Sequence, residues 1–237
     1  MLLQTGQFTC STSPGDTAAE TMDLFSLVSV VLLLAAPVRP QSMHPSRVND
    51  YVDEILEDRL PGEVNSQIHL PAFTRDVSHD SHYGSVLFQS TNVSKHERMK
   101  RWVDCNGSVA EFPERVVISC DVRFPGILVR MDSLLTYDSN DTYRVAARIF
   151  YPLSTRLVLQ FAPWENPSAN LTRLSGFEKL EARFWGLDRS DPKNQKLAWG
   201  YEKVAKDIVQ QVVAEQVAPA LGRAAAKYRF PCCPDRP

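Results

Sequence analysis

The sequence predicts an α+β fold in which a short helix precedes a long antiparallel sheet and a long helix follows it. Between about Tyr83 and Leu187, apolar residues alternate with polar ones, which is the period of strands with one buried face. Between Tyr201 and Tyr228, apolar residues recur every three or four positions, which is the period of an amphipathic helix. Packing the apolar face of the sheet against the helix would bury both.

The first predicted element is a helix that begins at Ser46, whose hydroxyl can cap the free N–H groups of the first turn. One side of this helix is apolar and carries Val48, Val52, Ile55 and Leu60. Pro61 and Gly62 then end or bend it.

Alternating runs place the strands of the predicted sheet around five segments. These runs are Val86 to Phe88, Val117 to Phe124, Val145 to Tyr151, Leu157 to Phe161 and Leu180 to Phe184. Turn residues separate them and predict turns at Asn106-Gly107, Pro125-Gly126, 139–141 and 163–168. The pattern is typical of an antiparallel meander.

The last predicted element is a long helix that begins after Asp191. Asp191 is an N-cap residue and Pro192 suits the first helical position. Pro219 lies inside the apolar stripe, where a proline costs roughly 3 kcal/mol and crowds the carbonyl group of Glu215. The sequence therefore predicts a bend near the end of this helix.

The N-terminal 42 residues differ from the rest and are interpreted as an upstream extension followed by a secretory signal peptide that is removed. Residues 24–36 read LFSLVSVVLLLAA without a charge. That length suits a signal sequence and is short of the roughly 20 residues of a membrane span. Met22 opens a normal-looking signal, and we expect the mature chain to begin between Pro37 and Ser46. The domain is then 43–230, and 231–237 is a tail rich in cysteine and proline.

Four N-x-S/T sequons agree with a secreted glycoprotein. They begin at Asn92, Asn106, Asn140 and Asn170.

The cysteines fit an oxidising compartment. Cys105 and Cys120 bracket a 14-residue segment, and a disulfide between them would contribute about 3 kcal/mol. Cys232 and Cys233 are adjacent, so they either bond to another chain, giving a linked dimer, or remain free. Cys10 falls in the segment that is removed.

The charge balance gives no lead toward nucleic acid. Removing residues 1–42 takes away Arg39 and three acids (Asp16, Glu20 and Asp23), so 26 basic and 28 acidic residues become 25 of each. No nucleic-acid partner is therefore expected.

The segment VSHDSHYGS (77–85) is the closest approach to catalytic or metal chemistry. His79, Asp80 and His82 are potential ligands, but no supporting set of ligands and no G-x-S-x-G motif accompanies them. We interpret the segment as a polar loop and expect no catalytic residues, no metal and no cofactor.

The segment KHERMKRW (95–102) is strongly basic and has three interpretations. It is a solvated loop, an anion site for lipid headgroups or sulfated sugars, or a processing site. The anion site would use Lys95, Arg98, Lys100 and Arg101, with Trp102 as an amphipathic neighbour. Cleavage here would sever the sheet, which makes processing the weakest of the three.

Several stretches resemble the mite group 7 allergen family, over roughly residues 45–230. They are RVNDYVDEIL, GSVLFQSTNVSKHERMKRW, TRLSGFEKLEARFWGLD and EQVAPALGR. That family belongs to the tubular lipid-binding superfamily, with the juvenile-hormone-binding, takeout-like and bactericidal/permeability-increasing proteins. The late proline in EQVAPALGR is the most distinctive match, whereas the cysteine pair and the sequons are not expected of the family.

The resemblance implies a highly curved antiparallel sheet wrapped around the long C-terminal helix. It also implies a secreted, non-enzymatic, arthropod-type protein that holds a hydrophobic or amphipathic ligand between sheet and helix. Such a ligand would be a fatty acid, another lipid, a terpenoid hormone or a bacterial lipid. The residues expected to line the site are Val122, Phe124, Val145, Ile149, Leu159, Val204, Ile208 and Val212.

Apolar residues on these faces are also the ordinary residues of a protein core. The alternative is therefore a secreted protein-interaction or immune-recognition module of the same fold, with a fully packed interior.

Overall fold

A computed structural model of the chain describes residues 41–77, 84–111, 114–137, 142–162, 165–228 and 230. All of them belong to one unit, Arg39–Pro237. Several predictions fall outside the described residues. These concern the signal-like segment, Cys10, the histidines His79 and His82 with Asp80, the sequon at Asn140, and the tail with Cys232 and Cys233.

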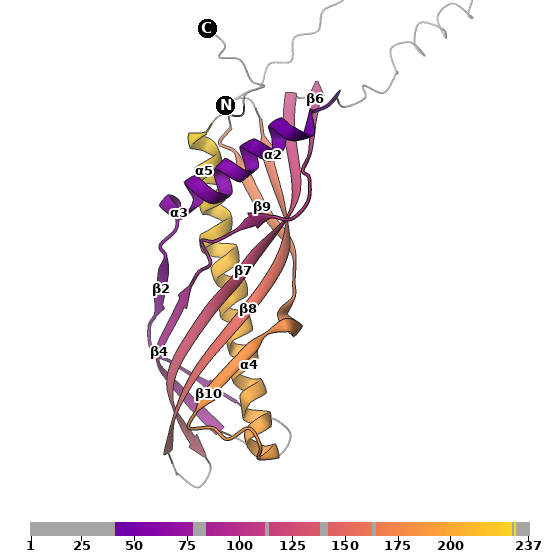
Figure 1. Ribbon diagram of the computed structural model, residues 1–237. Helices are drawn as coiled ribbons and strands as arrows, with labels where there is room; N and C mark the ends of the chain where they lie inside the picture. The colour runs from indigo at the N-terminus through magenta and orange to yellow at the C-terminus, as the bar shows by residue number, and fades with distance from the viewer. Residues whose placement is uncertain are drawn as a thin grey trace, which may run out of the picture. The chain divides into compact units, whose positions relative to one another are not determined.

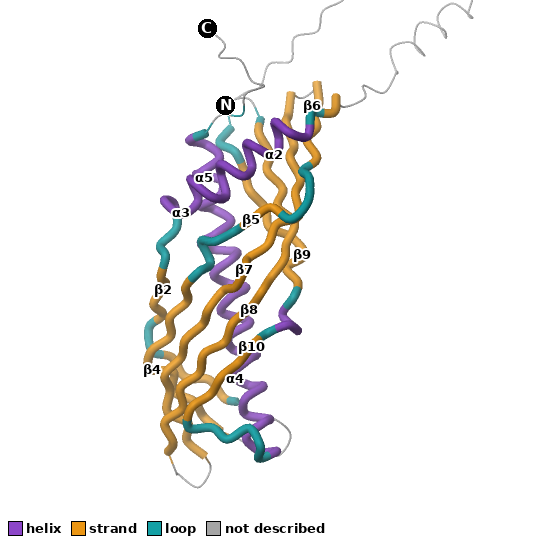
Figure 2. The backbone as a smooth tube through the Cα atoms, viewed as in Figure 1, coloured by secondary structure: helices purple, strands orange, loops and turns teal. Residues whose placement is uncertain are grey.

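The described part is α+β, with one open antiparallel sheet, a shorter N-terminal helical segment and a long C-terminal helix (Figures 1 and 2). The strands are β1 (Gln41–Ser42), β2 (Gln67–Leu70), β3 (Phe73–Asp76), β4 (Gly84–Ser94), β5 (Lys100–Arg101), β6 (Asn106–Glu111), β7 (Glu114–Tyr137), β8 (Thr142–Phe161), β9 (Ser168–Ser175) and β10 (Glu181–Trp185). The helices are α2 (Pro45–Glu54), α3 (Leu60–Glu63), η2 (Phe177–Lys179), α4 (Pro192–Val212) and α5 (Ala218–Lys227), and the π-helical turns are η1 (Ile55–Arg59) and η3 (Val213–Val217).

Strands β7 and β8 form the centre of the sheet and pair with each other over almost their whole length. The edge of β7 that faces away from β8 pairs in turn with β6, β5 and β4. The edge of β8 that faces away from β7 pairs with β9 near one end and with β10 near the other. Strand β1, which falls within the segment predicted to be removed, pairs with β6 through Gln41 and Ser42.

Two predicted turns are wrong, because at both places the residues belong to strands of the sheet. Asn106 and Gly107 lie within β6, where Gly107 leaves room for the side chain of Val48. Pro125 and Gly126 lie inside β7, where the pairing with β8 shifts between Phe124 and Ile127. This is a β-bulge, which accommodates proline and glycine as a turn does.

The predicted start of the long helix is confirmed, whereas the predicted cap of the short helix is wrong. The long helix begins as predicted, because the side chain of Asp191 accepts a hydrogen bond of 2.9 Å from the N–H of Lys193 and Pro192 opens the first turn. The short helix begins at Pro45, and the hydroxyl of Ser46 instead lies 2.8 Å from Nδ1 of His44. The prediction of Ser46 as the cap was therefore wrong.

Each helical segment accommodates a proline by the same device. A π-helical turn ends two residues before Pro61 and another ends two residues before Pro219. In the second, the N–H of Ala218 bonds to the carbonyl of Val213, five residues back, instead of four. The wider turn relieves the missing N–H and the steric conflict that a proline brings to an α-helix. The predicted disturbance at Pro219 is thus a π-helical turn from which α5 continues.

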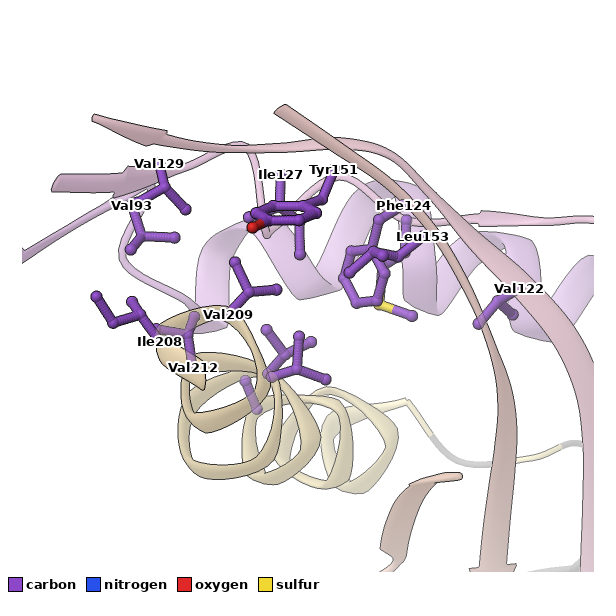
Figure 3. Close-up of a cluster of buried hydrophobic side chains, with 14 of the residues drawn as sticks. Val93, Val122, Phe124, Ile127, Val129, Tyr151, Leu153, Ile208, Val209 and Val212 are labelled. Atoms are coloured by element: carbon purple, nitrogen blue, oxygen red, sulfur yellow. The ribbon is translucent and has the colours of Figure 1, made fainter. Parts of the chain in front are cut away.

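The core lies between the sheet and the C-terminal helix. Figure 3 shows Ile208, Val209 and Val212 of α4 beneath apolar side chains of the strands, among them Ile127 and Tyr151. At the other end of the helix, Tyr51 of α2 packs against Tyr228 and Phe230, and its hydroxyl donates to the carbonyl of Tyr228 at 2.9 Å. The N-terminal and C-terminal helical segments therefore share one core.

Candidate functional site

A groove of about 930 Å³ opens between β9 and the second half of the C-terminal helix. Strand β9 pairs with β8 through one edge, and its other edge borders the helix. One wall is formed by Asn166, Pro167, Ser168, Ala169, Asn170, Leu171 and Leu174. The opposite wall is formed by Gln210, Val213, Ala214, Ala218, Pro219, Gly222 and Ala226. Most of these side chains are apolar, so the groove suits an apolar ligand.

Small residues on the helix explain why the groove is open. Ala214, Ala218, Gly222 and Ala226 follow one another at intervals of four, so they share one face of the helix. A Cβ atom at position 222 would lie 3.1 Å from the carbonyl oxygen of Pro167. Gly222 therefore permits a close approach of helix and strand, while its small neighbours leave space beside it.

The π-helical turn and its proline lie in the same wall. Val213 and Ala214 belong to the turn, and Pro219 follows it, and all three line the groove. π-Helical turns are rare and are frequent at functional sites. The one feature that is irregular in the long helix is therefore part of the groove.

A charged cluster closes one end of the groove. Glu63 of α3 is bonded to Lys227, and its backbone carbonyl accepts a hydrogen bond of 3.0 Å from Arg223 of α5. The hydrogen bond from Lys227, assisted by Arg223, lowers the pKa of the Glu63 carboxyl below its ordinary value. The cluster has two cations and one anion, so this end carries a net positive charge and can attract the head of an amphipathic ligand.

The structure places the predicted lining residues behind this groove and not in it. Seven of the eight are buried in the core: Val122, Phe124, Val145, Ile149, Leu159, Ile208 and Val212. Val204 is partly buried and packs against the same core. None of the eight lines the groove, because the sequence pattern that predicts a buried face does not distinguish packed atoms from open space.

The groove residues that were missed carry a weak signal in the sequence. The interval of four between Ala214, Ala218, Gly222 and Ala226 marks a helix face with little side-chain volume. Such a face permits either a close helix contact or a groove, and only the position of β9 decides between them.

The four cations of the predicted anion site do not converge. Arg101 is bonded in a bidentate manner to Asp53 of α2, at 2.9 and 2.8 Å. Lys100 lies 3.8 Å from Glu57, and Arg98 lies 3.5 Å from Glu97. Lys95 has a left-handed backbone, with φ of 65°, and its ammonium group lies 6.0 Å from the centre of the Phe150 ring. Arg101 and Lys100 thus join β5 to the N-terminal helical segment, whereas Arg98 and Lys95 have other neighbours, and the four do not form a common site.

The predicted disulfide and sequons fall at the following positions. Cys105 and Cys120 are bonded, which ties the start of β6 to β7. Asn106 and Asn170 are exposed at β6 and β9, respectively, whereas Asn92 in β4 is half-buried and its side-chain oxygen is enclosed. Asn106 and Asn170 are accordingly the described sequons with room for a glycan.

The described ranges contain no group of three or more His, Cys, Asp or Glu side chains arranged to hold a metal ion. Over the same ranges, no helix combines the length and hydropathy needed to cross a membrane.

No protein-family model and no curated protein sequence matches this chain.

Proposed function

We propose that this protein is a secreted, non-enzymatic carrier of a hydrophobic or amphipathic ligand, which binds in the groove between β9 and the C-terminal helix. In this proposal the sheet curves around the helix, as the resemblance to the tubular lipid-binding superfamily implies. The observation that carries the proposal is the groove itself, which is about 930 Å³ in volume and walled largely by Ala, Leu, Val and Pro. This volume lies in the usual range of small-molecule sites.

Binding would work by burial of apolar surface. Apolar area removed from water contributes about 25 cal/mol per Å², or about 0.8 kcal/mol for each methylene. The cluster of Glu63, Arg223 and Lys227 would orient a polar or anionic head at one end. The candidate ligands are accordingly a fatty acid, a terpenoid with a polar end, or a bacterial lipid.

The direct experiment extracts the secreted protein with organic solvent and identifies the bound molecules by mass spectrometry. A fluorescent fatty-acid probe then measures binding to the delipidated protein. We expect a stoichiometric lipid in the extract and saturable binding of the probe, which the extracted lipid displaces.

A variant tests whether the groove is the site. Ala214→Trp places a large side chain at an exposed position that lines the groove. Excluding about two methylenes of ligand weakens binding by roughly tenfold. The matched control is Gln216→Trp, an equally large substitution at an exposed position of η3 outside the groove lining, and we expect it to bind as the wild type does. Equal effects of the two variants would rule the groove out.

One observation favours the alternative of a protein-interaction module. The apolar residues expected to line a ligand site are instead packed core, as that alternative requires. It predicts that the secreted protein yields no lipid and that Ala214→Trp changes nothing measurable in solution.

A further inference from the structure

A second concavity, of about 290 Å³, lies on the face of the sheet that points away from the helix core. Its residues come from four parts of the chain: Trp102 from the segment after β5, Asp121, Val122 and Arg123 from β7, Ser154, Thr155 and Arg156 from β8, and Arg173 and Ser175 from β9. We refer to it as the arginine pocket. It shares no lining residue with the groove.

Three arginines meet one carboxylate in the arginine pocket, so the pocket has a net charge of +2. Asp121 pairs with Arg156, with N–O distances of 2.9 and 3.4 Å. Within the part of the chain that the structure describes, no ion pair joins Arg123 or Arg173 to a carboxylate. The hydrogen bond from Arg156 lowers the pKa of the Asp121 carboxyl, and Arg173 adds to this only by its charge. The guanidinium groups of Arg123 and Arg173 therefore keep their N–H groups for an anion.

The backbone holds these groups in place. Trp102 is fixed to β7 by a hydrogen bond of 2.9 Å from its backbone N–H to the carbonyl of Asp121, and the guanidinium of Arg123 is next to its ring.

Arg173 adopts a conformation that non-glycine residues avoid. Its φ is 59°, in the left-handed region, and the pairing of β8 with β9 shifts nearby, between Ser154 and Arg156. Bulges and left-handed residues redirect side chains and cluster at functional sites. Here the distortion lies in the wall of the arginine pocket.

Trp102, the aromatic residue of the arginine pocket, is exposed. Its exposed fraction is 52%, and that of Val103, the next residue along the chain, is 45%. Tryptophan is enriched at the interface between water and lipid, and arginine binds phosphate oxygens in a bidentate manner.

We propose that the arginine pocket binds a phosphate group, through Arg123 and Arg173, with Trp102 beside it. Guanidinium groups match phosphate oxygens with two parallel hydrogen bonds, and the hydroxyls of Ser154 and Ser175 line the same space. The phosphate belongs either to a lipid headgroup or to a soluble molecule. The site is independent of the proposed carrier function, because it uses none of the groove residues.

The test uses two probes with the full secreted protein. Inorganic phosphate is titrated by calorimetry, and vesicles of phosphatidylcholine with or without phosphatidic acid are tested by co-sedimentation. Binding to phosphatidic acid vesicles alone assigns the phosphate to a lipid headgroup. Saturable binding of free phosphate that competes with the vesicles assigns a soluble source. The absence of both kinds of binding overturns the proposal.

A double variant locates the binding. Arg123→Gln with Arg173→Gly removes both cations, and glycine adopts the left-handed backbone at position 173 without creating an N-x-S/T sequon. The matched control is Arg130→Gln with Arg148→Gln, because these exposed arginines lie opposite each other on β7 and β8 and carry the same charge. Losing two charge-assisted contacts should weaken binding by more than roughly tenfold, whereas the control should bind as the wild type does. Equal losses of binding in the two double variants would mean that the anion is attracted by general charge, and they would overturn the proposal that the arginine pocket is the site.

Unfolding midpoints separate loss of binding from loss of structure. Arg123 is half-buried and Arg173 is exposed, so we expect the double variant to unfold at nearly the wild-type temperature. Ala214→Trp should leave phosphate binding intact, which keeps this proposal distinguishable from the carrier function.

Discussion

His96 is a fully buried imidazole in the loop that follows β4. Burial lowers its pKa from the ordinary value of 6.5, against smaller opposing effects of the Glu97 carboxylate and the backbone of Asn65. The folded protein therefore favours the neutral ring, while the unfolded chain takes up a proton near pH 6.5. The sequence shows the histidine but not its burial, because its neighbours Lys95, Glu97 and Arg98 are polar.

The low pKa of His96 predicts how stability depends on pH. Its contribution is fully present above pH 6.5 and is lost as the pH falls, because the unfolded state binds the proton more readily. We expect the melting temperature of the wild type to fall more between pH 7.5 and pH 5.5 than that of His96→Leu. His69→Leu, at an exposed position on β2, is the control and should retain the wild-type slope. Parallel slopes for the wild type and His96→Leu would contradict the prediction.

Single residues were predictable from sequence where their role is local. Asp191 caps the helix that follows it, and Cys105 bonds to Cys120, which is 15 positions away. The ion pair of Arg101 was not predictable, because its partner Asp53 is 48 positions away and only the fold brings the two together. Lys100 likewise lies beside Glu57 of η1, so both cations face the N-terminal helical segment and not a common anion site.

The β7–β8 pair shows how an element absorbs residues that usually end one. Pro125 and Gly126 interrupt β7, and Pro152 lies opposite them in β8, where the pairing shifts. The alternation on either side identifies parts of β7 and β8, as it does for β4 and β10, whereas no run of this kind was predicted for β2, β3 or β9. The bulge at Pro125 and Gly126 was not predictable, because turns and bulges favour the same residues.

The bulge depends on the missing side chain of Gly126. A Cβ atom at this position would overlap the ring of Phe150. We expect Gly126→Ala to lower the free energy of unfolding by about 1–3 kcal/mol, as overpacking does. The cost should fall when Phe150→Ala is introduced first, which urea unfolding of the single and double variants measures.

Gly62 provides the comparison for this substitution. No atom lies within 4 Å of the position that its Cβ would occupy, so Gly62→Ala should be neutral or mildly stabilising. If Gly126→Ala behaved like Gly62→Ala, the bulge would not require glycine.

At the scale of the whole molecule, Glu63 joins the N-terminal helical segment to the C-terminal helix. Its bonds to Lys227 and Arg223 lower its pKa below the ordinary 4.5. The stabilisation is present above pH 4.5 and is lost as the pH falls through the lower value in the folded state. We expect Glu63→Gln to melt below the wild type at neutral pH and the gap to close in acid.

A neutral substitution elsewhere controls for the change in charge. Glu178→Gln removes an exposed carboxylate on η2 and should leave the melting temperature unchanged at both pH values. A gap between Glu63→Gln and the wild type that stays constant down to pH 3 would refute the role of this cluster.

The order of elements was predictable from the sequence, whereas the groove was not. Periodicity shows which faces are buried, and it led to residues such as Val122 and Ile149 that are core. The groove arises where β9 and α5 approach without filling the space between them. That depends on the relative placement of two elements about 50 residues apart in the chain, which no local pattern encodes.

The contribution of α4, η3 and α5 to the core has a consequence during synthesis. This segment, Pro192–Lys227, leaves the ribosome after all strands of the described sheet. Until it emerges, the apolar side chains of β7 and β8 that it covers have no partner and are exposed to other chains. A nascent chain truncated before Pro192 should therefore bind chaperones or aggregate, and the sheet becomes competent to fold only after this helical segment has been made.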